Sequence, residues 1–397
     1  MSDVTNGAGE VVADGVRALP PREQWTAAAR RRRDTYAVTP NAPLLKTEFG
    51  YYCWDDWKQQ GMPDFPQWSP AAAEYFHYDE PGNIQLGGLG WCEPEYVPRF
   101  EVKVLEDRGD TEVEQDWAGR KVLYFKGRRN GFMPEYLDTP VSDLASWQAQ
   151  AEWRLDPQDP RRYEGLEQRL APVRAAAARG AMVTQGVAGS FMYLRSMLGP
   201  ERLLFAFYDQ PELIEAMMTR WLALADAVTA AHQKFVTFDE IFFAEDNCYN
   251  NGPLVAPAMI SEMLHPYYKE LLRRVKARQL DRQRHLYLQI DTDGACQPLI
   301  PFYMAELGMD AMSPFEVASG CDVVAIGREH PQLVMRGGID KRALAQGPQA
   351  IDEMVERILP AMRARGGYIP CCDHGVPTEV SLENYRYYRQ RCVELGE

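Results

Sequence analysis

Short apolar runs alternate with helical stretches from about residue 141 to the end of the chain. The apolar runs lie at 181–184, 240–244, 286–290, 311–315, 333–336 and 367–370. Between them, apolar positions follow a helical spacing at 210–234, 257–278, 297–307, 348–365 and 381–394. Strand–helix alternation of this kind is typical of α/β proteins with a parallel sheet. Six such units, with at least one more strand expected upstream, predict a closed (β/α)8 TIM barrel rather than an open sheet.

The N-terminal part of the chain is less regular. Residues 1–20 contain Asp, Glu and Gly without an apolar core, so we expect a disordered tail and not a signal peptide. A short helix with a basic end is expected at 21–33, followed by a short strand at 43–49. Residues 50–98 are rich in Trp, Tyr, Pro and Gly without a sustained period, which predicts an irregular aromatic segment.

Two runs of alternating apolar and polar residues, at 99–105 and 121–126, predict a pair of antiparallel strands. We therefore expect residues 99–126 to form a β-hairpin insertion over one face of the barrel. The sequence shows no internal repeat and no low-complexity linker, so residues 21–397 are interpreted as a single domain with an N-terminal extension.

The composition limits the classes of function. A chain of 397 residues fits one barrel with insertions. Its net charge of −14 argues against nucleic-acid binding, because that role needs a basic face. No apolar stretch reaches the length of about 18 residues that a membrane span requires. The eight cysteines form no framework pattern and are typical of reduced thiols, so we expect a soluble, cytoplasmic protein.

Polar residues follow the predicted strands at the end where a barrel places its active site. Five of the six strand ends carry a carboxylate, and nearby glycines allow a ligand to approach the backbone closely. The candidate residues at these ends are Gln185, Glu245, Asp246, Asn247, Asp291, Asp293, Glu316, Asp340, Cys371, Cys372, Asp373 and His374. Tyr52, in the aromatic segment, is expected either to cover this pocket or to pack the N-terminal part of the chain.

Clustered carboxylates support two kinds of chemistry. They bind cations through oxygen, or they hold protons because like-charge repulsion raises some of their pKa values. Asp291 and Asp293 alternate along a strand, so both side chains are expected on the same side. The alternative is a structural role for each acid, as a helix cap or as a partner of Arg336.

His374 follows two cysteines at the last strand end. An imidazole there serves as a metal ligand, as a proton donor or, when charged, as a binding site for an anion. Cys372 is a further candidate metal ligand, but no second Cys or His pair at short spacing accompanies it, so a buried free thiol is the preferred interpretation. Glycine-rich phosphate loops and a nucleophile elbow are missing from the sequence.

Several motifs of the chain are those of a known family. They are Glu245-Asp246-Asn247, His265-Pro266-Tyr267-Tyr268-Lys269, Asp293-Gly294, Glu316-Val317-Ala318, Gly337-Gly338-Ile339-Asp340-Lys341, and Asp373-His374 with Val376-Pro377. In these segments the chain resembles the uroporphyrinogen decarboxylase-like family, densely from about 239 to 394 and more weakly at 127–136. The resemblance implies a TIM barrel and two candidate chemistries. One is decarboxylation of acetate side chains on uroporphyrinogen without cofactor or metal; the other is zinc-dependent methyl transfer that involves a corrinoid protein and a thiol.

The chain departs from both branches of this family. Where the decarboxylases carry an Arg-rich motif, residues 47–52 contain no Arg, although His374 and its following glycine resemble the His-Gly of those enzymes. Where the methyltransferases carry His-x-Cys for zinc, this chain has Asp291-x-Asp293, and His374 stands near the place of a further Cys. The set Glu245, Asp291, Asp293 and His374 would suit a divalent metal that prefers oxygen and nitrogen, zinc or another, or a cationic substrate.

The leading hypothesis is methyl transfer or demethylation of a small methylated substrate, with methylcobalamin carried on a corrinoid partner protein. The alternatives are a cofactor-free decarboxylase of a uroporphyrinogen-like or smaller carboxylate, and a non-catalytic binding protein. Catalysis is assigned to His374, Asp293 and Glu245, and a divalent metal to Asp291, Asp293 and His374, with Cys372 less favoured. Substrate binding is assigned to Asp246, Asn247, Glu316, Asp340, Tyr52 and Gln185. We expect a monomer or homodimer without nucleic-acid or membrane partners.

Overall fold

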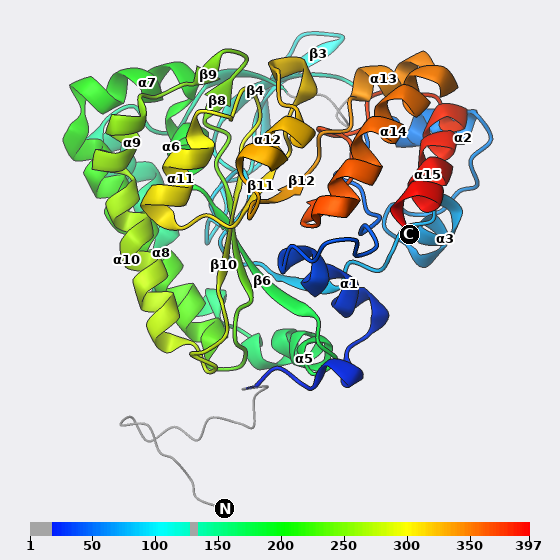
Figure 1. Ribbon diagram of the computed structural model, residues 1–397. Coiled ribbons are helices and arrows are strands. Elements are labelled where there is room, and N and C mark those ends of the chain that lie inside the picture. Colours follow the sequence, from blue (N-terminus) through cyan, green and yellow to red (C-terminus); the bar gives the residue numbers. More distant parts are fainter. Residues whose placement is uncertain (1–17, 128–133) are drawn as a thin grey trace, which may run out of the picture.

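Residues 18–127 and 134–397 are described by the computed structural model. Most of the expected tail at 1–20, and the middle of the segment 127–136, lie outside the described residues. The described chain forms a curled parallel sheet surrounded by helices, with a small antiparallel sheet at one end (Figure 1).

Seven strands form the curled sheet, in the order β1-β6-β7-β10-β11-β12-β13, and every neighbouring pair is parallel. Their bounds are Asn83–Leu86 (β1), Met182–Ala188 (β6), Glu240–Ala244 (β7), Tyr287–Asp291 (β10), Ala311–Ser313 (β11), Val334–Arg336 (β12) and Tyr368–Ile369 (β13). Six of these strands coincide with the predicted apolar runs, and the predicted α/β, TIM-barrel-like fold class is confirmed.

β1 comes from the segment that we expected to be irregular. It has only four residues and is followed by Gly87 and Gly88, so no periodic pattern is long enough to reveal it. The same segment also contains two short helices, α2 (Trp54–Gln59) and α3 (Pro70–Phe76).

The chain before α2 lies beside the last strand of the sheet. The expected strand at 43–49 does not form, because this segment makes a single bridge, from Tyr51 to Val376, instead of a ladder. The backbone N–H of Val376 donates to the carbonyl of Gly50 at 2.8 Å, and Leu45 packs inside the barrel with Ile369. The segment thus occupies the eighth place in the barrel wall without being a regular strand.

Alternation along the strands decides which side chains enter the barrel. In β7, Glu240 points inward, where it accepts hydrogen bonds from Tyr36 and from Thr184. Its neighbour Ile241 and the alternate residue Phe243 belong to the outer core, beneath the helices. Period-two alternation is the ordinary geometry of a strand, so every second residue at the strand ends faces the central cavity.

The helices cover the outside of the sheet (Figure 1). Their bounds are Leu144–Ser146 (α4), Leu166–Ala177 (α5), Ser190–Leu198 (α6), Pro200–Asp209 (α7), Pro211–Gln233 (α8), Pro257–Met263 (α9), His265–Arg278 (α10), Leu299–Leu307 (α11), Val323–Glu329 (α12), Lys341–Gln346 (α13), Pro348–Arg365 (α14) and Leu382–Gly396 (α15). The helix expected at 257–278 is divided into α9 and α10, with Pro266 in the first turn of the second helix, where proline is tolerated.

Helix α1 (Ala27–Tyr36) closes the amino end of the barrel. Tyr36 is buried with Leu45, Met182, Ala311 and Val334, and its hydroxyl bonds inside the barrel to Glu240. Because this end is filled by side chains, the open end of the barrel lies at the carboxyl ends of the strands, where active sites of this fold are found.

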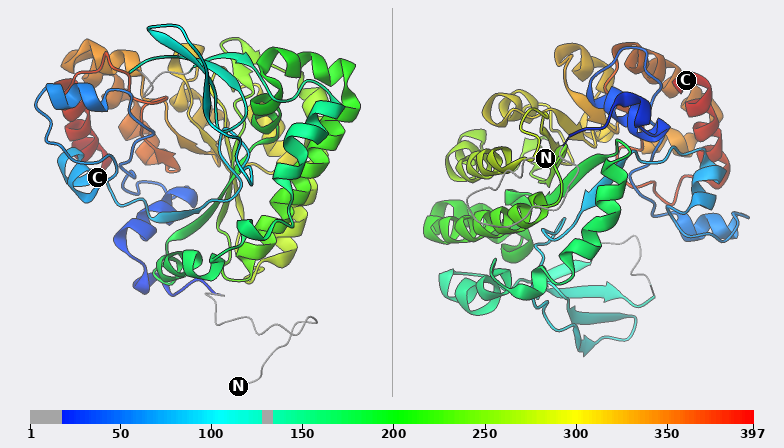
Figure 2. Two further views of the ribbon diagram at one scale, coloured as in Figure 1. Left: turned by 180° about the vertical axis from the view of Figure 1, so that it is seen from behind. Right: turned by 90° about the horizontal axis from the view of Figure 1, so that it is seen from below.

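The insertion is larger than predicted. Its four antiparallel strands are Lys103–Asp107 (β2), Thr111–Gln115 (β3), Lys121–Phe125 (β4) and Glu135–Asp138 (β5). The runs at 99–105 and 121–126 do not pair with each other as a hairpin, because β3 lies between them and pairs with both. This sheet extends from the open end of the barrel (Figure 2). A two-stranded hairpin, Cys248–Tyr249 (β8) and Gly252–Pro253 (β9), follows β7.

No helix in the described ranges 18–127 and 134–397 is both long and apolar enough to cross a membrane.

Candidate active site

A cavity of about 690 Å³ opens at the carboxyl ends of the strands, next to the insertion. It is lined by Phe49, Tyr52, Trp91, Cys92, Glu93, Arg120, Tyr136, Thr139, Met192, Arg195, Ser196, Gly199, Pro200, Ala244, Glu245, Asp246, Asp291, Asp293 and His374. The cavity thus brings together six of the residues selected from the sequence: Tyr52, Glu245, Asp246, Asp291, Asp293 and His374. It is not lined by seven others: Gln185, Asn247, Glu316, Asp340, Cys371, Cys372 and Asp373.

Asp291 is the last residue of β10 and lies deep in this cavity. Its carboxylate accepts a hydrogen bond from the hydroxyl of Ser313 on β11. Burial raises the pKa of Asp291 to about 7, although Ser313 and the buried guanidinium of Arg336 both act in the opposite direction. Near neutral pH, a large fraction of Asp291 therefore carries a proton.

Asp293 follows two residues later, so its side chain enters the same cavity as that of Asp291. Burial raises the pKa of Asp293 to about 8, and the negative charges of Asp246, Asp291 and Glu316 add to this effect. At neutral pH Asp293 is a neutral acid with a proton to donate.

His374 faces Asp293 across the cavity. Its Nε2 atom lies 3.5 Å from Oδ2 of Asp293, and its Nδ1 atom lies 3.3 Å from the hydroxyl of Tyr52. Burial lowers the pKa of His374, and the positive charge of Lys341 lowers it further, so the imidazole is neutral at neutral pH. The ring of Tyr52 fits against His374 because residue 375 is glycine: a Cβ atom there would lie 2.9 Å from that ring.

The two cations of the cavity wall are already paired. Arg195, on α6, donates to Oδ2 of Asp246 at 2.6 Å. Arg120, from the insertion, lies 2.7 Å from Asp116 and 2.8 Å from Glu93. Within the described part of the chain, the cavity therefore presents no unpaired cation to a substrate carboxylate.

Glu245 borders the cavity, but its carboxylate is directed at the start of α6. It accepts hydrogen bonds from the backbone N–H of Phe191 at 2.8 Å, from the N–H and hydroxyl of Ser190 at 3.2 and 3.1 Å, and from the hydroxyl of Tyr268. This close approach requires glycine at position 189, where a Cβ atom would lie 2.7 Å from the carboxyl carbon. Glu245 thus satisfies N–H groups that a helix start leaves open.

Asn247 and Gln185 also point away from the cavity. The side-chain amide of Asn247 donates to the hydroxyl of Tyr303 at 2.5 Å, and its oxygen accepts from Thr292 at 3.1 Å. Gln185 lies 2.7 Å from Nδ1 of His232 on α8. Both side chains are buried between the strands and the outer helices.

Glu316, Asp340 and Asp373 lie around Lys341, behind the cavity. The ammonium group of Lys341 is 3.0 Å from Glu316 and 3.8 Å from Asp373. Asp340 accepts from the backbone N–H of Arg342 at 2.8 Å and caps α13. Burial raises the pKa of Asp373, and Lys341 opposes this rise. Of these acids, Glu316 helps to raise the pKa of Asp293 from outside the cavity lining.

The two cysteines before His374 are buried and do not line the cavity. Burial raises the pKa of the Cys371 thiol to about 12 and also raises that of Cys372, so neither is a thiolate at neutral pH. In the described ranges, no three His, Cys, Asp or Glu side chains form a group that could hold a metal ion. A divalent metal at Asp291, Asp293 and His374 stays a prediction.

Several lining residues escaped the sequence analysis. Trp91 stacks on Phe242 with ring centroids 4.6 Å apart, and it follows β1, which the sequence did not reveal. Arg195 lies inside a helix, and Arg120 belongs to the insertion. The sequence around Arg195 and Arg120 contains no local pattern that predicts their place in the cavity lining.

Comparisons with known proteins identify relatives of the chain. Residues 135–394 match the family model described as uroporphyrinogen decarboxylase (URO-D). A curated uroporphyrinogen decarboxylase from Alcanivorax borkumensis is 26% identical over 227 residues, which cover 54% of this chain and 56% of that protein. The chain thus matches only about half the length of this relative. A solved methyltransferase structure from Methanosarcina mazei superposes with a TM-score of 0.51 at 13% identity, over 92% of this chain and 98% of that one, which is a likeness in fold.

Proposed function

Because the chain belongs to the uroporphyrinogen decarboxylase family, we propose that its barrel cavity removes a methyl group from a small methylated substrate. The family resemblance expected from the sequence is confirmed: the chain is similar in sequence to a uroporphyrinogen decarboxylase and in fold to a methyltransferase. Which reaction this chain catalyses is our proposal.

The observation that supports demethylation most strongly is the arrangement of charges in the cavity. A polycarboxylate substrate needs free cations, whereas Arg120 and Arg195 are both paired with carboxylates of the protein. The other polar side chains in reach include two acids with raised pKa values, Asp291 and Asp293. An uncharged or cationic substrate needs no free cation from the lining, and the aromatic wall formed by Trp91 and its neighbours suits its apolar part.

In the proposed step, the bond between the methyl carbon and its oxygen or nitrogen breaks, and the bonding electrons stay on the heteroatom. The methyl group passes to a nucleophilic acceptor. Asp293 donates its proton to the leaving heteroatom where that atom becomes anionic, as in a methyl ether, and His374, 3.5 Å away, assists its reprotonation from water. A corrinoid protein would supply the nucleophilic methyl acceptor.

The proposed step does not depend on a zinc–thiolate centre. Zinc in methyltransferases of this family would favour thiolate and imidazole ligands. Among the described lining residues the one thiol is Cys92, and burial raises its pKa to about 12, while Cys371 and Cys372 are buried outside the lining. The donor set therefore does not fit a zinc–thiolate site. Elemental analysis of protein produced with added zinc, manganese or iron tests the oxygen–nitrogen alternative: one bound ion per chain that is lost in Asp291→Asn supports it, and trace occupancy contradicts it.

Decarboxylation is the second candidate. It is favoured by the sequence match to a uroporphyrinogen decarboxylase and by Asp293, because a protonated acid also suits the carbanion left by loss of carbon dioxide. This reaction would require Arg195 to leave Asp246 and bind the substrate carboxylate.

One pair of assays separates the two reactions. The purified protein is mixed with reduced cobalamin and a panel of aromatic methyl ethers and methylated amines, and formation of methylcobalamin is followed by absorbance. In parallel it is incubated with uroporphyrinogen, and carbon dioxide release is measured. Methylcobalamin formation without carbon dioxide release supports the proposal; carbon dioxide release without methylation on any panel member contradicts it.

A further inference from the structure

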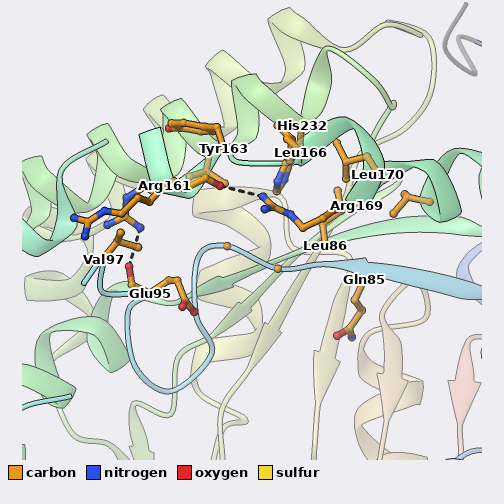
Figure 3. A pocket seen from close by; sticks show the side chains of 15 residues that line it. Gln85, Leu86, Glu95, Val97, Arg161, Tyr163, Leu166, Arg169, Leu170 and His232 are labelled. Carbon is orange, nitrogen blue, oxygen red and sulfur yellow. Dashed lines mark hydrogen bonds between the residues drawn. The ribbon is translucent and has the colours of Figure 1, made fainter. Parts of the chain in front are cut away.

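A second pocket, of about 450 Å³, lies on the outside of the barrel wall. It is formed between the end of β1, helix α5, the last turns of α8 and the loop around Val97 (Figure 3). None of the residues that line it also lines the central cavity. It is a separate site, in the size range of small-molecule pockets.

His232 provides a hydrogen-bond acceptor in this pocket. Its Nδ1 atom lies 2.7 Å from the side-chain oxygen of Gln185, while the side-chain amide nitrogen of Gln185 donates to the carbonyl of Gly186 at 2.8 Å. Since the Gln185 oxygen only accepts, Nδ1 of His232 carries the proton and Nε2 presents its lone pair. His232 is only 6% exposed, and Figure 3 shows its side chain pointing toward Arg169. No described residue hydrogen-bonds to Nε2, so an acceptor that is accessible from the pocket is left for a ligand.

Two positive charges border the same pocket without a carboxylate partner among the described residues. Arg162 donates to the backbone carbonyls of Glu95, Arg154 and Asp156 at 2.6–2.8 Å. Arg169 donates to the carbonyls of Glu164 and Arg162. These contacts orient the guanidinium groups without pairing them directly with a carboxylate, while the nearby charges of Asp159, Glu95 and Asp156 partly balance Arg162, in a chain whose net charge is −14.

The other charged side chains of the pocket are already paired. Arg161 lies 2.5 Å from Asp159, and Glu95 lies 3.0 Å from Arg99. The remaining wall is mainly aliphatic and includes Leu86. The pocket therefore combines positive charge, an apolar wall and one unpartnered acceptor.

We propose that this pocket is a second binding site, for a small organic acid with a short apolar body and a hydroxyl group. The carboxylate meets the guanidinium groups of Arg162 and Arg169, and the hydroxyl donates to Nε2 of His232. An occupant would also contact Gly87 and Gly88, at the start of the loop that carries Trp91 into the central cavity.

The test uses 4-hydroxyphenylacetate as the probe, in titration calorimetry with the full chain. Phenylacetate lacks the hydroxyl and 4-hydroxybenzyl alcohol lacks the carboxylate. Arg169→Gln removes one charge at an exposed side chain, Leu166→Trp fills the pocket, and Arg179→Gln is the matched control on an exposed arginine just beyond α5.

We expect 4-hydroxyphenylacetate to bind the wild type, with a Kd about tenfold higher in Arg169→Gln, because a charge-assisted contact is lost. Phenylacetate and 4-hydroxybenzyl alcohol should each bind the wild type more weakly than 4-hydroxyphenylacetate does. Arg179→Gln should bind 4-hydroxyphenylacetate as tightly as the wild type. Absence of binding to the wild type would overturn the proposal. So would equal affinities of the wild type, Arg169→Gln and Leu166→Trp, because the probe would then occupy another site. If Leu166→Trp does not fold, the comparison of Arg169→Gln with Arg179→Gln decides alone.

Discussion

The Nε2 atom of His374 lies 3.5 Å from Oδ2 of Asp293, at the open end of the barrel. The environment moves their pKa values in opposite directions: burial raises that of Asp293 to about 8 and lowers that of His374. At neutral pH the dominant state is therefore a protonated carboxyl group beside a neutral imidazole. Two neighbouring groups whose pKa values are shifted in opposite directions are a common arrangement for acid–base catalysis.

Replacement of His374 tests whether the imidazole takes part in turnover. His374→Ala should reduce kcat at least about 100-fold, because general acid–base assistance is lost. The melting temperature should change little, since within residues 18–127 and 134–397 the side chain makes one hydrogen bond, to Tyr52. Steady-state kinetics and thermal unfolding are measured together, and full activity in the folded variant would remove His374 from the mechanism.

Replacement of Glu245 tests whether this side chain stabilises the fold or takes part in catalysis. Glu245→Ala leaves the N–H groups of Ser190 and Phe191 and the hydroxyl of Tyr268 without their acceptor. The free energy of unfolding should fall by about 3 kcal/mol, whereas Glu245→Gln, which keeps an acceptor oxygen, should lose less. Urea unfolding provides the measurement. A Glu245→Gln variant with wild-type stability but no turnover would show that Glu245 acts in catalysis, as the sequence predicted.

Trp91 tests the role of the aromatic wall. The ring is stacked on Phe242 and forms part of the cavity lining. Trp91→Ala should raise KM by about tenfold, since a buried aromatic contact of the substrate is worth about 1 kcal/mol or more, and should change kcat much less. Trp91→Phe serves as the control and should retain most of the affinity. A drop in kcat at unchanged KM would contradict a binding role.

The raised pKa of Asp291 has a consequence for stability. The unfolded chain releases this proton near pH 4, whereas the folded chain holds it up to about pH 7. Between these values the folded state binds more protons, so Asp291 makes the free energy of unfolding fall as pH rises. Asp291→Asn removes this dependence and should be more stable relative to the wild type at pH 8 than at pH 5. An identical difference in melting temperature at both values would argue against the raised pKa.

The sequence predicted most of the barrel because its strands are apolar and its helices are long. At the end of strand β10, the alternation predicted that Asp291 and Asp293 lie on the same side, and both side chains line one cavity. The same alternation puts Ala244 inside and directs Glu245 outward, so counting acids at the strand ends overstated the acidity of the cavity. Asp340 is an example of the alternative considered from the sequence, because it caps α13.

Other parts of the fold and the site could not be predicted from the neighbouring residues in the sequence. β1 is too short for a periodic signal, and the middle strand of the insertion, β3, consists mainly of polar residues. The pairing of Arg195 with Asp246 joins positions 51 residues apart, and Arg120 reaches the cavity from the insertion. The absence of an unpaired cation among the described lining residues, which separates the two proposed reactions, depends on these distant contacts.

The pH dependence of methylcobalamin formation tests whether Asp293 is the proton donor, with wild type and Asp293→Asn compared between pH 5.5 and 9.5. If protonated Asp293 is the donor, the wild-type rate on a methyl ether falls as pH rises through about 8, where the carboxyl group loses its proton. Asp293→Asn should be at least about 100-fold slower and should lack this decline. A wild-type rate without a decline near pH 8, or a fully active Asp293→Asn variant, would contradict the account.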